Sequence, residues 1–140
     1  MLGLQEVHVI PARLAPQLYA LLRIVCALVY LAHAFQKLFG MFGGRVVPLT
    51  SMLGAAGIIE SVAGMLLLIG LFTRAAAFIA SGEMAAAYFI AHLPHAVWPI
   101  QNMGEPAVLL CFVFLYIAAR GAGPWSVDAA RSTSPRALAA

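Results

Sequence analysis

The stretch SMLGAAGIIESVAGMLLLIGLFTRAAAFIASGEMAAAYFIAHL, residues 51–93, decides the fold. It contains two apolar runs, each close to the ~20 residues that an α-helix needs to cross a bilayer. A very short link at Thr73–Arg74 joins them, so we expect helices at about Ser51–Phe72 and Arg74–Leu93 that pair as an antiparallel hairpin. The runs are too long for membrane-barrel strands and do not alternate between polar and apolar residues.

Two further apolar segments lie on either side of this hairpin, at about Gln17–Phe39 and Gly104–Ala119. The second is short, so we expect it to begin within Ile100–Met103 or to lie in locally thinned lipid. The sequence therefore predicts an all-α fold, a polytopic membrane bundle of four helices.

The composition indicates the same class of protein. Hydrophobic residues make up 64% of the 140-residue chain and charged residues 9%, whereas soluble domains have about 25% charged residues. Such a chain cannot hide its apolar surface in water, and it is too hydrophobic for intrinsic disorder. Although the net charge is +3, no run of Lys and Arg fits nucleic acid, so we expect the lipid bilayer to be the main partner.

We divide the chain into an amino-terminal interfacial segment (1–16), a four-helix domain (17–120) and a basic tail (121–140), loosely ordered beyond Trp125. The amino-terminal segment lacks the features of a signal peptide, so we expect it to be retained. On the predicted topology one side carries two basic residues, Lys37 and Arg45, and the other carries six, namely Arg13, Arg23, Arg74, Arg120, Arg131 and Arg136. The positive-inside rule then places both termini in the cytoplasm.

Polar residues within the helices are the candidates for function. On the first helix, Arg23, Tyr30 and Lys37 fall close to one line, and we expect Arg23 to reach the inner headgroups. On the second, Gly57 and Gly64 share a face with Glu60, so a neighbouring helix can approach and Glu60 should not face lipid.

On the third helix, Glu83 and His92 are nine residues apart, a spacing that predicts opposite faces and argues against one tight site containing both. Gly82 and Ala86 form a small-residue step beside Glu83.

We expect the polar groups of the outer half to converge, because polar groups in hydrocarbon need partners. The candidate ligand-binding residues are His33, Gln36, Lys37, Glu60, Glu83, His92 and Glu105. Carboxylates and imidazole can exchange protons with a quinone head group, whose ring would lie near His33 and Glu105 and stack on Trp98 and Phe39. Alternatively, Glu60 and Glu83 are protonated or paired with Lys37 or Arg23 and only hold helices together.

Other chemistry has little support in the sequence. His92, His95 and Glu105 could supply metal ligands, but a His-x-x-His spacing on irregular chain is weak, and we assign no metal. Cys26 and Cys111 lie in apolar stretches without a C-x-x-C motif, which is typical of apolar fillers. No catalytic constellation is recognisable, so catalytic residues remain unassigned.

Several segments resemble the DoxX family of small bacterial membrane proteins. The sequence HAFQKLFG at residues 33–40 resembles the family's H-x-x-Q-K-L-F-G segment, and LLLIGLFTR at 66–74 resembles its LLLxGLxTR hairpin. Gly104–Glu105 is similar to its G-E-x-A-x-L start, and Gly123–Pro124 with Ser126–Asp128 to its GP…S-x-D ending. The resemblance covers residues 21–128 and rests on the order and spacing of the four segments together.

The resemblance implies a four-helix bundle in the bacterial inner membrane with both termini inside. Some members are associated with quinol oxidation or thiosulfate:quinone oxidoreduction, and others with oxidative-stress complexes. We therefore expect an accessory subunit of a quinone-linked redox system, with a protein partner that holds the redox centres. A quinone is the cofactor class that the resemblance suggests. The alternatives are a non-catalytic scaffold subunit and, with less support, a small-molecule or metal transporter.

Overall fold

The computed structural model describes residues 9–133, and every regular element in that range is a helix. Four of the helices have 15 or more residues, and three have fewer than eight. In addition, one π-helical turn extends the third long helix. In chain order they are η1 (Ala12–Leu14), α1 (Ala15–Phe39), α2 (Met52–Ile69), α3 (Thr73–Ala87), the π turn η2 (Tyr88–His92), α4 (Pro99–Asn102), α5 (Glu105–Arg120) and α6 (Val127–Ser132).

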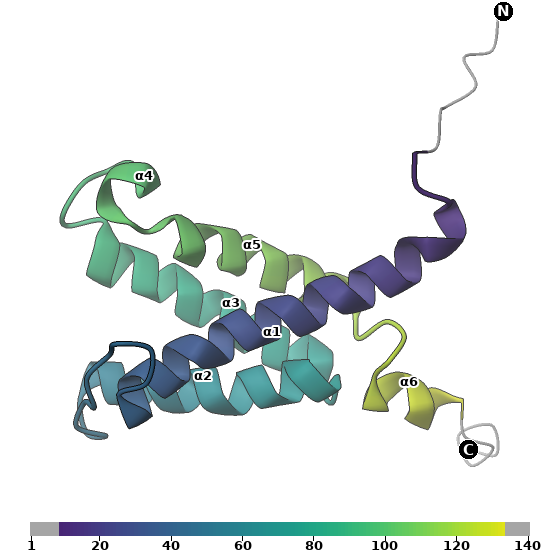
Figure 1. Cartoon of the computed structure of the whole chain (residues 1–140), viewed down its shortest axis with the longest axis horizontal. Helices are drawn as coiled ribbons and strands as arrows, with labels where there is room; N and C mark the ends of the chain where they lie inside the picture. Colours follow the sequence, from purple (N-terminus) through teal and green to yellow (C-terminus); the bar gives the residue numbers. More distant parts are fainter. Residues whose placement is uncertain (1–8, 134–140) are drawn as a thin grey trace, which may run out of the picture.

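The long helices pack in sequence around a shared core. Helix α1 packs along α2, α2 packs against α3, and α3 packs along α5. The connections α1–α2 and η2–α5 lie at one end of the molecule, and the start of α1 and α6 lie at the other (Figure 1). The predicted hairpin of the second and third helices is confirmed.

Three helices are long and apolar enough to cross a membrane, namely Ala12–Phe39, Met52–Ile69 and Thr73–His92. They match three of the predicted spans to within a few residues. The fourth predicted span is the 16-residue helix α5, which is shorter than the other three. The described residues are thus all-helical, with three candidate membrane-spanning helices, whereas the fourth crossing and the orientation of the termini remain predictions.

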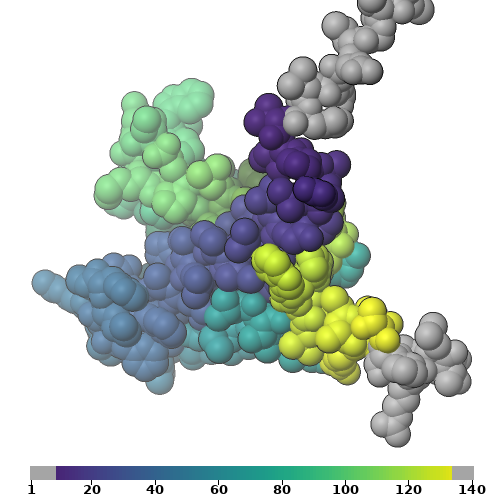
Figure 2. All heavy atoms as spheres, turned by 45° about the vertical axis from the view of Figure 1, so that its right-hand side comes forward, coloured from purple at the N-terminus to yellow at the C-terminus, as the bar shows by residue number. Residues whose placement is uncertain are grey.

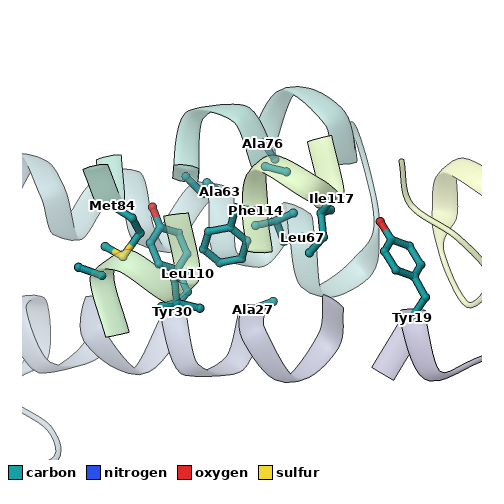
Figure 3. Packing of buried hydrophobic residues seen from close by; sticks show 13 residues of the cluster. Tyr19, Ala27, Tyr30, Ala63, Leu67, Ala76, Met84, Leu110, Phe114 and Ile117 are labelled. Carbon is teal, nitrogen blue, oxygen red and sulfur yellow. The ribbon is translucent and has the colours of Figure 1, made fainter. Parts of the chain in front are cut away.

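Small residues bring the helices close together. Ala27 of α1, Ala63 of α2 and Ala77 of α3 are buried in the core, so the helix backbones approach closely there. The rings of Tyr30 and Phe114 fill the centre, with centroids 5.0 Å apart in an edge-to-face arrangement (Figure 3). This core holds α1 against α2 and α5 against α3, and α2 and α3 carry the buried or half-buried carboxyl groups of Glu60 and Glu83.

Arg23 is fully buried, so the expectation that it reaches the headgroups was wrong. Its guanidinium donates hydrogen bonds to backbone carbonyls at the end of α2 and in the segment after α5, those of Leu67, Leu68, Ala122 and Trp125. The last carbonyls of a helix have no intrahelical partner, and a buried arginine that binds them satisfies both groups. Arg23 therefore joins α1, α2 and the carboxy-terminal segment.

The carboxy-terminal segment, as far as residue 133, packs on the end of the molecule where α1 starts (Figure 1). Its atoms lie against the start of α1 and the α2–α3 link (Figure 2). Both carboxylate oxygens of Asp128 accept hydrogen bonds, from the N–H groups of Phe72 at 3.0 Å and Thr73 at 2.9 Å, and so cap α3. The chain beyond Trp125 forms α6, so the expectation of a loose tail was wrong for residues 126–133, because capping and packing order them. Residues 1–8 and 134–140, which belong to the predicted terminal segments, lie outside the described range.

Candidate functional site

A cleft of about 530 Å³ lies between α1, α2, the α3–η2 helix and the start of α5. Most of its wall is apolar and includes Met52, Ile59, Ile79, Met84 and Ile90. Five of the seven predicted ligand-binding residues also line it, namely His33, Lys37, Glu60, Glu83 and His92. The structure thus brings together polar side chains from three helices that are far apart in the sequence.

Lys37 and Glu60 form an ion pair across the α1–α2 contact. The Glu60 side chain is fully buried, whereas that of Lys37 is 23% exposed. Glycines on the same face of α2 allow this approach, since a Cβ at Gly57 would lie 2.9 Å from Leu38 and one at Gly64 2.8 Å from Leu31. The prediction that Glu60 does not face lipid is confirmed.

One oxygen of Glu60 has no partner in the described part of the chain. The Lys37 ammonium contacts Oε1, whereas Oε2 is buried and accepts no hydrogen bond. An unsatisfied buried acceptor costs about 1–3 kcal/mol. Because Glu60 lines the cleft, a hydrogen-bond donor of a ligand can remove this cost.

Glu83 on α3 is held by a tyrosine of α1. The hydroxyl of Tyr30 donates a hydrogen bond to its Oε2 at 3.1 Å, and Tyr30 itself is fully buried against Phe114. The cleft thus contains two carboxyl groups and one ammonium group. If both carboxyls were ionised, one negative charge would lack a cation in an apolar wall, which is costly. The arrangement therefore favours a bound proton or a ligand that donates hydrogen bonds.

Glu83 and His92 both line the cleft, so the expectation that they face opposite sides was wrong. The cause is the π turn η2, in which Leu93 N–H donates to Tyr88 O at 2.9 Å, five residues back. One extra residue in a turn rotates the following side chains by roughly 100° relative to a regular α-helix. No residue-level signal in the sequence distinguishes this turn from a continuing helix.

Two residues outside the predicted set support the cleft. Tyr30 orients Glu83, and its place in line with Lys37 on the first helix was a usable signal. Asn102 shapes the connection beside His92: its side chain donates to Ala96 O at 2.7 Å and accepts from Gly104 N–H at 2.8 Å. Its backbone carbonyl lies 3.0 Å from Nδ1 of His92.

Gln36 and Glu105 do not line the cleft. Gln36 packs against Gly44 of the following loop, where a Cβ would come within 2.2 Å of its Cγ. Glu105 is exposed in the first turn of α5, where a carboxylate is favourable at the positive end of the helix. A ring bound between His33 and Glu105 is therefore not supported.

The proposed aromatic contacts also lie elsewhere. Trp98 is 67% exposed and Phe39 is 62% exposed, and neither lines the cleft. Trp98 lies in the connection after η2, directly before α4. The apolar wall of the cleft consists of aliphatic side chains and methionines instead.

The described residues contain no group of three or more His, Cys, Asp or Glu side chains suited to a metal ion. His92, His95 and Glu105 therefore do not assemble as the metal hypothesis requires. Cys26 and Cys111 are both free and partly buried, as expected for apolar fillers. The backbone carbonyl of Cys111 accepts a hydrogen bond from Ser81 at 2.8 Å.

Comparisons with known proteins found a family model and a relative that match this sequence. The sequence model of the DoxX family matches residues 18–93, which contain every polar residue of the cleft. An uncharacterized protein of Haemophilus influenzae (strain ATCC 51907 / DSM 11121 / KW20 / Rd) is 43% identical over 120 residues, covering 81% of this chain and 90% of that protein. No solved structure matches.

Proposed function

Because this chain belongs to the DoxX family, we propose that it binds the head group of a quinone or quinol in the cleft. In this role it serves as an accessory subunit of a quinone-linked redox system in the bacterial inner membrane. The electrons pass to or from a partner protein that carries its own redox centre.

The observation that carries the proposal is the buried, unpartnered Oε2 of Glu60, a residue that lines a mostly apolar cleft. A quinol hydroxyl is a hydrogen-bond donor and suits this oxygen. A quinone carbonyl is an acceptor and suits the Lys37 ammonium or the His33 imidazole, which line the same cleft. The aliphatic wall suits the ring and the start of an isoprenoid tail.

The proposed topology has four crossings with both termini in the cytoplasm and the cleft in the outer half. The start of α1 lies at the same end of the molecule as α6 (Figure 1), which supports an even number of crossings. Arg74, Arg120 and Arg131 lie at that end as well, whereas Arg45 lies in the opposite connection. An excess of basic residues marks the cytoplasmic side.

Photolabelling with a short-chain azidoquinone tests this function. The full-length protein in mild detergent is irradiated with the probe, and labelled peptides are identified by mass spectrometry. We expect labels on residues 52–60 and 79–92, competed by unlabelled short-chain quinone, and at least about fivefold weaker labelling in Glu60→Leu, since the lost hydrogen bond is worth about 1 kcal/mol or more.

Glu105→Gln is the matched control, because it removes a carboxylate that lies outside the cleft. Labelling that is not competed, or that is equal in Glu60→Leu and Glu105→Gln, contradicts the proposal. So does labelling confined to residues 118–132 at the other end of the molecule.

The second candidate function is a scaffold subunit, and the open face of α3 favours it. A Cβ at Gly82 would meet no atom within 4 Å, so no helix among the described residues packs against Gly82 in the small-residue step Gly82–Ala86. Such steps allow close helix packing in membranes. If the protein is a scaffold, Gly82→Leu should abolish a larger complex on native gels, whereas Glu60→Leu should leave it intact.

A further inference from the structure

A second cavity, of about 670 Å³, lies at the end of the molecule that holds α6 (Figure 1), away from the cleft. It is bordered by the α2–α3 link, the end of α5 and the segment that leads into α6. Its polar lining consists of two arginines, one aspartate and two hydroxyl residues, namely Arg74, Arg120, Asp128, Thr73 and Ser132. None of these groups has a part in the proposed quinone site.

Arg74 has one edge of its guanidinium free within the described chain. Its Nη1 donates to the carbonyls of Ala118 and Ala119, and its Nη2 donates to that of Arg120 at 3.2 Å. A guanidinium has five N–H donors, so these three bonds leave the Nε–H and one Nη2–H. That pair of donors forms the edge that binds the two oxygens of a phosphate or carboxylate.

Gly121 keeps this edge uncovered. A Cβ at this position would lie 3.2 Å from Nη2 and 3.3 Å from Nε of Arg74, and the residue has a φ of +94°. Any other L-residue would be strained here and would place its side chain against the guanidinium. The glycine therefore leaves room beside Arg74 in the wall of the cavity.

The other two charged groups are fixed in place. The guanidinium carbon of Arg120 lies 4.8 Å from the centre of the Tyr19 ring, and its Nη1 donates to the Tyr116 hydroxyl at 3.3 Å. For Asp128, slight burial alone would raise the pKa, but hydrogen bonds from Thr73 and Phe72 and the charge of Arg131 lower it. Asp128 is therefore a carboxylate at neutral pH, and the cavity has two positive groups and one negative group.

We propose that this cavity binds the head group of phosphatidylethanolamine. Its phosphodiester fits between Arg74 and Arg120, and its primary ammonium faces Asp128 and the Ser132 hydroxyl. Both oxygens of Asp128 already accept backbone N–H hydrogen bonds, but a purely anionic headgroup would place no cation against its negative charge. Phe72 and Ala75 at the rim are apolar and exposed, as contacts for acyl chains require. The site lies at helix ends, where the bilayer surface is expected.

Native mass spectrometry of the full-length chain in detergent tests this site. Phosphatidylethanolamine, phosphatidylcholine and phosphatidylglycerol are added at equal concentration, and the lipid-bound fractions are compared. We expect phosphatidylethanolamine to bind about fivefold or more better than phosphatidylcholine, since a trimethylammonium group has no N–H donor and one hydrogen bond is worth about 1 kcal/mol. Arg120→Gln should weaken binding of both phosphatidylethanolamine and phosphatidylglycerol, and Asp128→Asn should reduce the preference for phosphatidylethanolamine over phosphatidylglycerol.

Arg45→Gln is the matched control, because Arg45 is exposed in the α1–α2 connection and does not line the cavity. Equal binding of the three lipids by the wild type overturns the proposal without the need for any variant. Equal losses in Arg120→Gln and Arg45→Gln also overturn it. Inorganic phosphate and glycerophosphoethanolamine are added as soluble competitors, and full displacement by inorganic phosphate alone would identify a simple anion site instead.

Discussion

The Tyr30 hydroxyl on α1 donates a hydrogen bond to Glu83 on α3 at 3.1 Å. Seven residues further along α1, Lys37 pairs with Glu60 on α2. One face of α1 therefore holds a carboxyl group from each of two other helices in the same cleft. This relationship makes the polar groups structural partners as well as candidate ligand contacts, and the two roles make different predictions.

Tyr30→Phe should destabilise the protein by about 1–3 kcal/mol, because Glu83 loses its donor while the ring still packs on Phe114. The free energy of unfolding in mixed micelles measures the effect. Tyr116→Phe is the control, since Tyr116 is exposed and its hydroxyl accepts from Arg120. Equal, small effects of the two changes would show that the Tyr30–Glu83 bond contributes nothing to stability.

Removing one member of the Lys37–Glu60 pair should cost more than removing both. Lys37→Met leaves the buried Glu60 carboxylate without its cation, and breaking such pairs costs about 3–5 kcal/mol. The double variant Lys37→Met/Glu60→Gln should recover part of this loss. Glu60→Gln alone should cost less than Glu60→Leu, because the amide still makes hydrogen bonds. A double-mutant cycle on unfolding free energies measures the coupling, and strictly additive effects would contradict it.

The sequence predicted the helices well because apolar length and turn chemistry are local signals. The hairpin at Thr73, the glycine face around Glu60 and the convergence of His33, Lys37 and Glu60 all follow from spacing along regular helices. These features need no knowledge of how distant segments pack.

Features that depend on tertiary contacts were missed. The burial of Arg23 depends on hydrogen bonds to carbonyls 44 to 102 residues away in the sequence, which a helical wheel does not include. The position of His92 depends on one π turn, and that of Glu105 on where α5 begins. The motif Ser126–Asp128 was recognised as a family feature, but its role as a cap on α3 required the fold.

Arg23→Lys should destabilise the protein strongly despite keeping the charge. A lysine has a single nitrogen and cannot reach the carbonyls of Leu67, Ala122 and Trp125 together. Each carbonyl left buried without a donor costs about 1–3 kcal/mol. Thermal unfolding followed by circular dichroism should show a large fall in Tm, whereas Arg13→Lys, at an exposed site, should show none. A wild-type Tm for Arg23→Lys would argue that Arg23 is exposed to the headgroups after all.

Asp128 should make stability depend on pH in the acid range. Its pKa in the folded protein is below the ordinary value of 3.8, so its contribution is complete above that value and is lost as the pH falls through the lower folded pKa. A cap of this kind is worth about 1 kcal/mol. Unfolding free energies measured between pH 6 and pH 2 should therefore decline less steeply below about pH 4 in Asp128→Asn than in wild type. Parallel pH profiles would show that Asp128 does not cap α3 as a carboxylate.

Both termini should be cytoplasmic, which is testable with single cysteines. In a background with Cys26→Ala and Cys111→Ala, Thr50→Cys probes the α1–α2 connection and Ala130→Cys probes α6, and both positions are exposed. The excess of basic residues beside α6 predicts that a membrane-impermeant maleimide added to intact cells labels only the cysteine at position 50. After lysis both positions should react, which controls for buried or unfolded protein. Labelling of position 130 in intact cells would reverse the orientation, and labelling of both would mean that α5 does not cross. In either case the cleft would open on a different side from the one proposed for the quinone.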